Sequence, residues 1–430
     1  MKKVGVIGLW HLGSVLCASW SKLGYEVVGF DYEKSRVDDL LNGISPVFEP
    51  NLNKTINYGL KNNTLNFSNN IEALNDCDFI LLSYDTPVDN NDSCDVTILE
   101  KSVDDVASIM KDNSILIVSS QSPVGYCSNL EKILIKKNNT LNLAYSPENL
   151  RLGEAIECYL NPGRIILGTS NKETERRCLS FLESITDNIL TMNIESSEVV
   201  KHGINSFLAL SVVFANNLSD ICEESGANIN DVVNGMKSDI RIGKKAYLSP
   251  GIGFSGGTLG RDLKVLDDFN TKKSGHANLF GHIHKANLER KTIITKKIVK
   301  LLRNEKEKTV GILGLTYKPG TSTLRRSLPL EIVNLLMKEK ISVKVFDPKA
   351  DYTELNSEPK FIIAKDVDDV SSDVDLLILL TEWEEFKHLD WDIIKEKMKT
   401  PIIFDTKNFL DGKIIKENKI TYYSLGGNNE

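Results

Sequence analysis

The sequence lacks three features that would each point to a particular class of protein. Its seven cysteines are an odd number, lie far apart and include no C-x-x-C spacing, so neither a disulfide framework nor a zinc site is expected. No apolar run approaches the roughly 20 residues that a membrane-spanning helix needs. The formal net charge of −7 argues against nucleic acid as a main partner. We therefore expect a cytoplasmic chain with reduced thiols and with no membrane or nucleic-acid partner.

Length and composition predict a globular protein of two or three domains. The chain has 430 residues, of which 41% are apolar and 26% are charged, and these shares are ordinary for a folded protein. A single core rarely serves a chain of this length. An H-x-H at His282 and His284 is accompanied by no visible set of further ligands, so no metal is predicted.

Apolar runs alternate with helical stretches at both ends of the chain. Strands are predicted at residues 4–8, 26–31, 79–82, 115–118 and 164–168, and later at 342–346, 376–380 and 402–405. Such alternation predicts a parallel, doubly wound sheet. Residues 309–315 (Thr-Val-Gly-Ile-Leu-Gly-Leu) also echo residues 3–9 (Lys-Val-Gly-Val-Ile-Gly-Leu), which predicts a second domain of the same kind.

Between these regions, residues 196–224 predict one long helix. Ser196 or Ser197 would cap its start, and Gly226 follows its end. We predict an α/β fold in which two Rossmann-like doubly wound domains are joined by a long central helix with a helical dimerisation region. The predicted domains are residues 1–195, 196–300 and 301–430.

The first glycine pair predicts a dinucleotide site. Gly8-Leu-Trp-His-Leu-Gly13 has the length of the dinucleotide fingerprint, although Trp10 occupies the position of its second glycine. Asp31 ends the next strand, where an acid accepts a hydrogen bond from the ribose 2′-OH and favours NAD over NADP. The alternative is a Rossmann-shaped domain that no longer binds a dinucleotide. His11 either reaches a phosphate or is a packing residue.

Two further segments indicate acid–base chemistry. Lys201 and Asn205 are four residues apart on the predicted long helix and therefore share a face. A partly buried lysine can take a proton from an alcohol, although this spacing also occurs on solvated helix faces. Gly253-Phe-Ser-Gly-Gly-Thr-Leu-Gly-Arg-Asp262 reads as a glycine loop that brings backbone N–H groups to a ligand. Asp262, at its end, would orient the lysine or a water.

Together with further motifs in the same order, these residues resemble the nucleotide-sugar 6-dehydrogenases, the UDP-glucose/GDP-mannose dehydrogenase family. The resemblance covers nearly the whole chain. The matching motifs include Gly43-Ile-Ser-Pro-Val-Phe-Glu-Pro50, Asp85-Thr-Pro-Val88, Ser120-Gln-Ser-Pro-Val-Gly125, Ser146-Pro-Glu-Asn-Leu-Arg151, Lys201-His-Gly-Ile-Asn205, Asp239-Ile-Arg-Ile-Gly243, Gly314-Leu-Thr-Tyr-Lys-Pro319 and Thr381-Glu-Trp383.

The resemblance implies an NAD domain, a central dimerisation region and a domain that binds the nucleotide of a nucleotide-sugar, with a UDP-sugar and a homodimer as the expected partners. It implies catalytic roles for Lys201, Asn205, Asp262, Glu148 and the residue at position 258. The residues expected to bind the cofactor are Gly8, His11, Leu12, Gly13, Asp31, Thr86, Gln121 and Arg325. Those expected to bind substrate are Asn149, Leu150, Arg151, Lys201, Asn205, Arg241, Tyr247, Gly253, Lys318 and Lys407.

The chain departs from the family where the second oxidation takes place. In similar enzymes a cysteine captures the aldehyde, and water then hydrolyses the thioester; Thr258 stands in that position here. A threonine hydroxyl is far less acidic than a thiol and is a poor nucleophile without a strong base. Gln121 replaces a threonine associated with the water, and Asn149 and Leu152 also differ from the usual residues.

Three activities follow as hypotheses. The first is a two-electron oxidation of a nucleotide-sugar alcohol to an aldehyde or ketone, in which Thr258 holds the reacting oxygen by a hydrogen bond. The second is the four-electron reaction to a uronate, run through an aldehyde hydrate without a covalent intermediate. The third is a non-catalytic protein that binds nucleotide-sugars.

Overall fold

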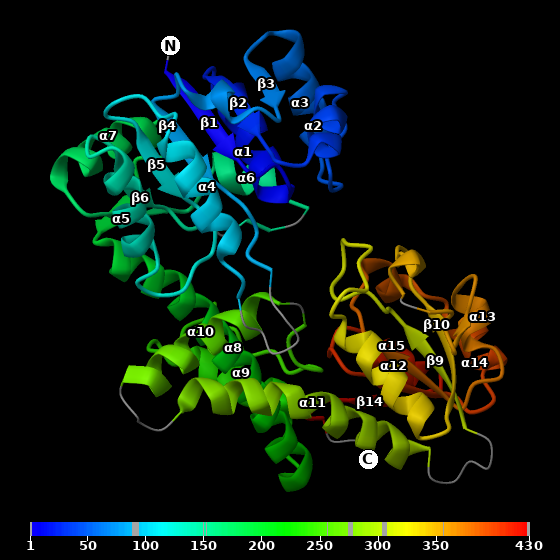
Figure 1. Ribbon diagram of the computed structural model, residues 1–430. Coiled ribbons are helices and arrows are strands. Elements are labelled where there is room, and N and C mark those ends of the chain that lie inside the picture. Colours follow the sequence, from blue (N-terminus) through cyan, green and yellow to red (C-terminus); the bar gives the residue numbers. More distant parts are fainter. Residues whose placement is uncertain are drawn as a thin grey trace. The chain divides into compact units, whose positions relative to one another are not determined.

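The computed structural model describes residues 2–87, 94–148, 150–151, 153–255, 257–273, 278–302, 308–355 and 357–427. The chain divides into two units, Met1–Ile204 and Asn205–Glu430. Each unit contains one mostly or wholly parallel β-sheet with helices packed against it (Figure 1). The three-domain division made from the sequence stays a prediction.

The first unit is a doubly wound sheet, as predicted. Its strand order is β3-β2-β1-β4-β5-β6-β7-β8, and all pairs are parallel except β6 with β7, which run antiparallel against the prediction. The strands are β1 (Lys3–Ile7), β2 (Glu26–Phe30), β3 (Leu65–Ser68), β4 (Phe79–Leu82), β5 (Ile115–Val118), β6 (Asn142–Tyr145), β7 (Ile165–Thr169) and β8 (Ile189–Met192). The helices are α1 (His11–Lys22), α2 (Lys34–Leu41), α3 (Leu52–Lys61), η1 (Ile71–Leu74), α4 (Thr97–Ala107), α5 (Cys127–Lys137), α6 (Ala155–Leu160) and α7 (Lys172–Leu182).

The strand order reverses between β1 and β4. Chain connections leave the sheet in opposite directions at such a point, which opens a crevice at the carboxyl ends of the strands. Strands such as β5, whose four residues are all buried, have helices on both faces and so consist of continuous apolar runs.

The long helix α8 (Ile194–Ser225) begins earlier than predicted. Neither Ser196 nor Ser197 caps it: the Ser196 N–H donates to Asn193 Oδ1, 2.8 Å away, and the Ser197 hydroxyl donates to the Ile194 carbonyl. The helix starts early because β8 ends at Met192 and leads directly into it. Gly226 follows its last residue with φ +75°, which confirms the predicted glycine end.

Among the described residues, α8 is the one helix long and apolar enough to cross a membrane by length and composition, although 50% of its most apolar window is buried within the fold. The core helix of a soluble protein has the same properties, so this is weak evidence for a span. The expectation of no membrane partner stays a prediction. All seven cysteines are free thiols.

The second unit continues with three helices and then repeats the sheet. The order β11-β10-β9-β12-β13-β14 matches β3-β2-β1-β4-β5-β6, which confirms the predicted internal echo. The helices are α9 (Ile229–Ser238), α10 (Thr258–Lys273), α11 (Leu279–Leu301), α12 (Leu328–Lys338), η2 (Tyr352–Glu354), α13 (Val367–Ser371), η3 (Glu384–His388), α14 (Trp391–Lys397) and α15 (Gly412–Glu417). The strands are β9 (Thr309–Leu313), β10 (Ser342–Phe346), β11 (Ile362–Ile363), β12 (Leu376–Leu379), β13 (Ile402–Asp405) and β14 (Thr421–Ser424).

A stack of three aromatic rings anchors α1 and α7 to one face of the first sheet. The Phe181 ring lies between Trp20 and Phe79, with centroid distances of 4.0 and 4.2 Å and interplanar angles of 9° and 6°. All three side chains are buried, and such rings contribute both apolar area and ring–ring contact.

We expect Phe181→Ala to lower the free energy of unfolding by about 3–5 kcal/mol, because it leaves a cavity between two rings that cannot close on each other. Urea unfolding followed by circular dichroism measures the change. Phe48→Ala, at a side chain that is 87% exposed, is the matched control. Equal midpoints for the two variants would contradict the role of the stack.

Candidate active site

Two glycines shape the turn between β1 and α1. Gly8 has φ +90°, and its N–H donates to the Phe30 carbonyl at 2.9 Å. At Gly13 a Cβ atom would lie 1.7 Å from the Gly8 carbonyl oxygen, so no other residue fits. The Ser83 hydroxyl donates to the carbonyls of Ile7 and Gly8 at 3.0 and 2.8 Å. The start of α1 is thereby held against the end of β1.

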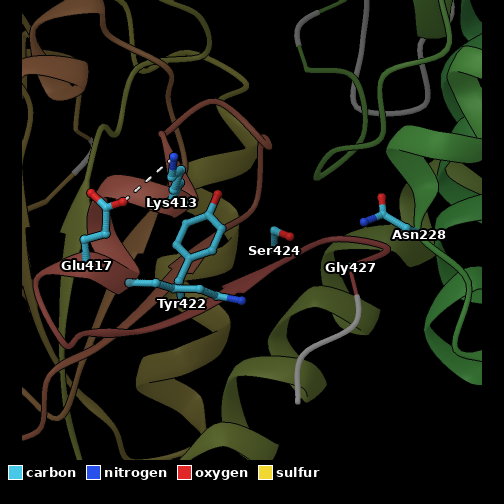
Figure 2. A pocket seen from close by; sticks show the side chains of 8 residues that line it. Asn228, Lys413, Glu417, Tyr422, Ser424 and Gly427 are labelled. Carbon is cyan, nitrogen blue, oxygen red and sulfur yellow. Dashed lines mark ion pairs between the residues drawn. The ribbon is translucent and has the colours of Figure 1, made fainter.

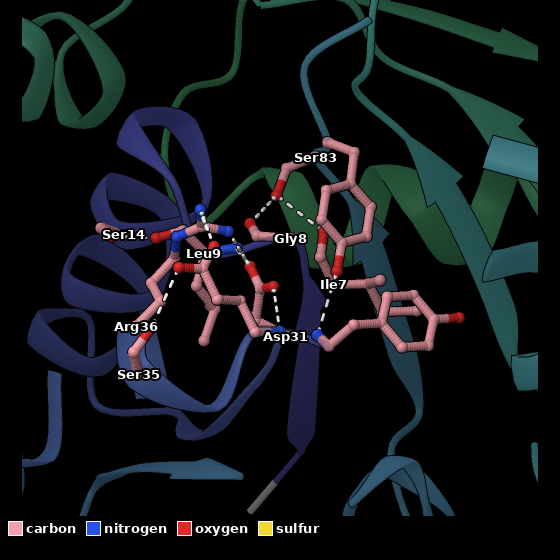
Figure 3. Close-up of polar contacts among 11 residues, drawn as sticks. Ile7, Gly8, Leu9, Ser14, Asp31, Ser35, Arg36 and Ser83 are labelled. Carbon is pink, nitrogen blue, oxygen red and sulfur yellow. Dashed lines mark hydrogen bonds and ion pairs between the residues drawn. The ribbon is translucent and has the colours of Figure 1, made fainter. Parts of the chain in front are cut away.

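Asp31 directly follows β2 and lies beside the turn between β1 and α1 (Figure 3). Its Oδ2 accepts the Leu9 N–H at 2.7 Å, and its Oδ1 accepts the Glu33 N–H at 3.0 Å. Arg36, which sequence reasoning missed, lies 2.9 Å from Asp31 Oδ2 and also pairs with Glu33. The arrangement therefore orients the carboxylate at the position where a dinucleotide presents its ribose.

Trp10 and His11 stand where α1 begins. Trp10 is 45% exposed and makes no side-chain cap bond. His11 Nε2 lies 3.0 Å from Glu49 Oε2. Of the two hypotheses for His11, this contact favours a packing residue, and Leu12 also packs against the core.

Glu49 is a residue that sequence reasoning missed. Its buried carboxylate accepts the N–H groups of Gly153 and Ala155, each at 2.9 Å, besides its contact with His11. It thereby ties the fingerprint helix α1 to the segment that follows Glu148. Since two glycines without room for a side chain and an oriented acid line the crevice, its residues fit a dinucleotide such as NAD.

Two residues predicted to bind the cofactor, Thr86 after β4 and Gln121 after β5, are in contact. The buried Thr86 hydroxyl donates to the Gln121 carbonyl at 2.8 Å. Two residues of α8 hold the segment after β5: Glu198 accepts the N–H groups of Gly125 and Cys127 at 2.6 and 2.9 Å, and His202 Nε2 lies 2.8 Å from the Ser122 carbonyl. Burial raises the pKa of Glu198 above its ordinary value although both N–H groups lower it.

Lys201 is buried on α8, and its Nζ donates to the backbone carbonyl of Glu148 at 2.6 Å. This contact brings two of the predicted catalytic residues together. Leu150 is partly buried against the core, and Arg151 is exposed with its guanidinium 3.8 Å from Glu154. Asn149, predicted to bind substrate, and Leu152 lie outside the described residues.

Asn205 and Asp262 form the second catalytic contact. Asn205 lies one turn after Lys201 on α8, and its Nδ2 donates to Asp262 Oδ2. Both side chains are buried. The predicted glycine loop is shorter than expected, because α10 already begins at Thr258 and Asp262 lies inside that helix. Thr258 is exposed at the first helical position, where backbone N–H groups lack intrahelical partners.

The remaining predicted substrate residues lie on separate elements of the second unit. Gly253 has φ +106°, and Tyr247 is exposed. Arg241 pairs with Asp239 at 2.6 Å, Lys407 pairs with Glu382 at 2.9 Å, and the Lys318 ammonium lies 5.7 Å from the Tyr317 ring centroid. Arg325, predicted to contact the cofactor, is exposed after Leu324.

A separate pocket of about 560 Å³ lies between α15, the end of β14 and the start of α9 (Figure 2). Its lining includes Asn228, Lys413, Tyr422 and Ser424, and none of the predicted site residues belongs to it. In the described part of the chain, no group of three or more His, Cys, Asp or Glu side chains is arranged to hold a metal ion.

Family models match the chain over both sheets and over the helical region between them. Three models of the UDP-glucose/GDP-mannose dehydrogenase family match in order: the NAD binding domain at residues 2–186, the central domain at 195–289 and the UDP binding domain at 311–412. The chain is 32% identical over 427 residues to a UDP-glucose 6-dehydrogenase of Rickettsia conorii, which covers 98% of each chain.

Two solved structures are similar over the full length. A UDP-glucose dehydrogenase from Pyrobaculum islandicum has a TM-score of 0.86 at 26% identity and covers 99% of this chain and 98% of its own. A UDP-D-ManNAc dehydrogenase from Pyrococcus horikoshii has a TM-score of 0.87 at 21% identity and covers 100% of both chains, which is a likeness of fold.

The glycine turn supplies a direct test of the dinucleotide crevice. We expect Gly13→Ala to weaken NAD binding at least tenfold, since the added methyl displaces the Gly8 carbonyl and opens the turn; calorimetry measures this. Gly163→Ala is the control, because a Cβ there meets nothing within 4 Å. UDP binding, matched to residues 311–412, should be unchanged in both variants. Full NAD affinity in Gly13→Ala would refute the assignment.

Proposed function

Because the chain belongs to the UDP-glucose/GDP-mannose dehydrogenase family, and is thus an NAD-dependent nucleotide-sugar dehydrogenase that acts on a CH–OH group, we propose that it removes only two electrons from each sugar. The alcohol CH–OH becomes a carbonyl, its hydride reduces one NAD to NADH, and its hydroxyl proton is released. The observation that carries the proposal is Thr258, which stands where the resemblance implies a cysteine nucleophile.

NAD, when bound in the crevice lined by Gly8, Gly13 and Asp31, supplies the hydride acceptor. Lys201, as the neutral amine, is proposed to take the hydroxyl proton as the hydride leaves and to release it to solvent afterwards. Its burial and its hydrogen bond to the Glu148 carbonyl fix the position of the amine, and a base must be held within hydrogen-bond reach of the proton it removes.

Asn205 is proposed to hold the reacting oxygen or a water. Donation from its Nδ2 to Asp262 fixes the plane of the amide, so Oδ1 lies on the opposite side of the amide from Asp262. An amide carbonyl oxygen accepts a hydrogen bond from a hydroxyl. Asp262 then acts through Asn205: the carboxylate is the group that holds the amide in this orientation.

Thr258 is proposed to donate a hydrogen bond to the developing carbonyl without becoming acylated. It is exposed at the first position of α10, where the helix dipole favours a partially negative oxygen. A second oxidation through this hydroxyl would pass through an ordinary ester, and neither Lys201 nor Glu148 is proposed to activate it. The carbonyl product therefore leaves.

A UDP-sugar is the proposed substrate, since the UDP binding domain model covers residues 311–412. Within this region Lys318 and Lys407 supply positive charge, and ammonium groups bind phosphate oxygens by charge-assisted hydrogen bonds. Arg325, proposed to contact the cofactor, and Arg241, proposed to reach the substrate of a second copy, are exposed. A cytoplasmic location is proposed alongside.

The four-electron reaction is the second candidate, because the first relatives carry the name UDP-glucose 6-dehydrogenase. With no thiol at position 258, it would have to oxidise the aldehyde hydrate. That route needs no covalent bond to the protein and would not depend on the Thr258 hydroxyl.

The ratio of NADH formed to sugar consumed separates the two reactions. We expect one NADH per sugar, read from absorbance at complete turnover of a limiting UDP-sugar. Two NADH per sugar would contradict the proposal. Thr258→Cys restores the thiol nucleophile, so it should raise the ratio towards two if the remaining acyl-transfer residues suffice.

Thr258→Ala tests the hydroxyl itself. We expect kcat to fall by about 100- to 1000-fold with little change in the KM for NAD, since one hydrogen bond to the developing carbonyl is lost. Thr258→Ser, which keeps the hydroxyl, is the matched control and should retain most of the activity. An unchanged kcat in Thr258→Ala would favour the hydrate route.

A homodimer is also proposed, from an apolar stripe on α8. Phe207, Phe214 and Ile221 recur every seven residues and are 67%, 44% and 60% exposed. A sustained seven-residue apolar spacing suits packing against a second helix. The equivalent stripe of a second copy of the chain would complete it with two-fold symmetry.

We expect Phe214→Asp to convert the dimer to a monomer, because dimerisation would bury the new charge. Light scattering coupled to gel filtration reports the mass. Tyr58→Asp, at another exposed aromatic side chain, should remain dimeric. A dimer that persists in Phe214→Asp at micromolar concentration would exclude this face as the interface.

A further inference from the structure

We propose that Asn216, Asn287 and Arg290 are positioning residues that hold loop residues 251–255, and through them the start of α10, in the geometry needed for reaction. None of the three belongs to the sites predicted from the sequence. The consequence for rate rests on the proposed function, in which Thr258 and Asp262 act from α10. The clamp itself rests on contacts within the second unit.

The first point of attachment is Gly251. Its N–H donates to Asn216 Oδ1 at 2.8 Å, and its carbonyl accepts from Arg290 Nε at 3.0 Å. Asn216 belongs to α8 and Arg290 to α11. The peptide group before Gly251 is thus hydrogen-bonded to α8, and the peptide group after it is hydrogen-bonded to α11.

The second point of attachment is Phe254, three residues on. Its N–H donates to Asn287 Oδ1 at 2.9 Å, and its carbonyl accepts from Asn287 Nδ2 at 3.1 Å. A single amide side chain therefore satisfies both backbone groups, as a neighbouring strand does for a residue in an antiparallel sheet. Side chains, and not the backbone of a strand or helix, supply all four partners.

Gly253 fits between these points for a steric reason. It has φ +106°, which side chains rarely adopt, and a Cβ there would lie 2.6 Å from Asn287 Oδ1. Any other residue would collide with the amide that holds Phe254. The loop and its clamp are therefore matched, and the glycine that sequence reasoning assigned to substrate has a conformational role.

The three clamp side chains are buried, and Arg290 is itself held by an acid. Asn216, Asn287 and Arg290 are each less than 5% exposed. Arg290 Nη1 donates to Asp220 at 2.6 Å, and Lys297 bridges Asp220 and Glu223, each at 2.7 Å. Burial acts to raise the pKa of Asp220, but Arg290 and Lys297 lower it below its ordinary value.

Thr258 and Asp262, the groups proposed to act in the reaction, lie close to the clamped residues in sequence. Thr258 follows Gly257 directly, and Asp262 lies one helical turn later. Ser255 Oγ accepts the Leu328 N–H at 3.1 Å, which attaches the loop to the start of α12 as well. A misplacement of about 1 Å at a reacting group costs on the order of a hundredfold in rate, so a released loop should slow the reaction.

Hydrogen exchange followed by mass spectrometry tests the clamp without turnover. In Asn287→Ala we expect the amides of residues 251–255 to exchange at least tenfold faster than in the parent chain, with the sheet amides unchanged. Asn217→Ala is the control, because Asn217 is a neighbouring amide on α8 that donates to the Val213 carbonyl. Loop exchange at the control rate in Asn287→Ala would overturn the proposal.

Steady-state kinetics supply the second readout. We expect kcat to fall about 10- to 100-fold in Asn287→Ala, Asn216→Ala and Arg290→Lys, with the KM for NAD within about twofold, since the dinucleotide crevice is not touched. Asn287→Asp keeps the acceptor for the Phe254 N–H and should fall between. Faster loop exchange with an unchanged kcat would overturn the positioning role.

The two proposals fail separately. If two NADH form per sugar, the two-electron proposal fails, while loop exchange in the Asn287 variants still judges the clamp. If exchange accelerates throughout the second unit as well as in the loop, the three residues are general packing residues and the positioning role is overturned. Loss of loop protection alone, with a matching loss of kcat, supports it.

Discussion

The hydrogen bond between the Asn205 amide and the Asp262 carboxylate is the contact on which the account of the site depends. It joins the scaffold helix α8 to the first turns of α10, where both partners are buried. A buried amide with a charged acceptor has one favoured orientation, so the contact orients Asn205 and holds the first turns of α10 against α8. The side-chain clamp on Gly251 and Phe254 also positions Thr258, because it holds the residues that precede Thr258 in the chain.

One structural device appears twice in the molecule. In the first sheet Asp31 accepts the N–H of Leu9, and in the second Asp347 accepts the N–H of Leu315, each at 2.7 Å. Each acid directly follows the second strand of its sheet, and each N–H belongs to the residue after the glycine that follows the first strand. The repeat explains why residues 3–9, around β1, and residues 309–315, around β9, have nearly the same sequence. It also fixes two crevices of the same design, of which the first carries the glycine pair that suits a dinucleotide.

Much of the fold was predictable because its signals are local. The apolar runs at 79–82 and 115–118 coincide with β4 and β5, and Gly226 ends α8 as expected. The predictions failed where a neighbouring element decides the boundary: β8 leads straight into α8, and α10 starts inside the predicted glycine loop. The partners of the clamp are 33 to 39 residues apart in sequence. No periodicity marks Asn216, Asn287 or Arg290, so only the folded chain shows what they hold.

The chain retains the residues proposed to oxidise an alcohol and lacks the thiol that would carry a second oxidation. Lys201, Asn205 and Asp262 are present and buried, whereas Thr258 offers a weak nucleophile. The mass of the product formed from a UDP-sugar and NAD tests this claim most directly. The account predicts a product lighter than the substrate by two hydrogen atoms, with its hydrate in water. A product that has also gained an oxygen atom as a carboxylate would contradict it.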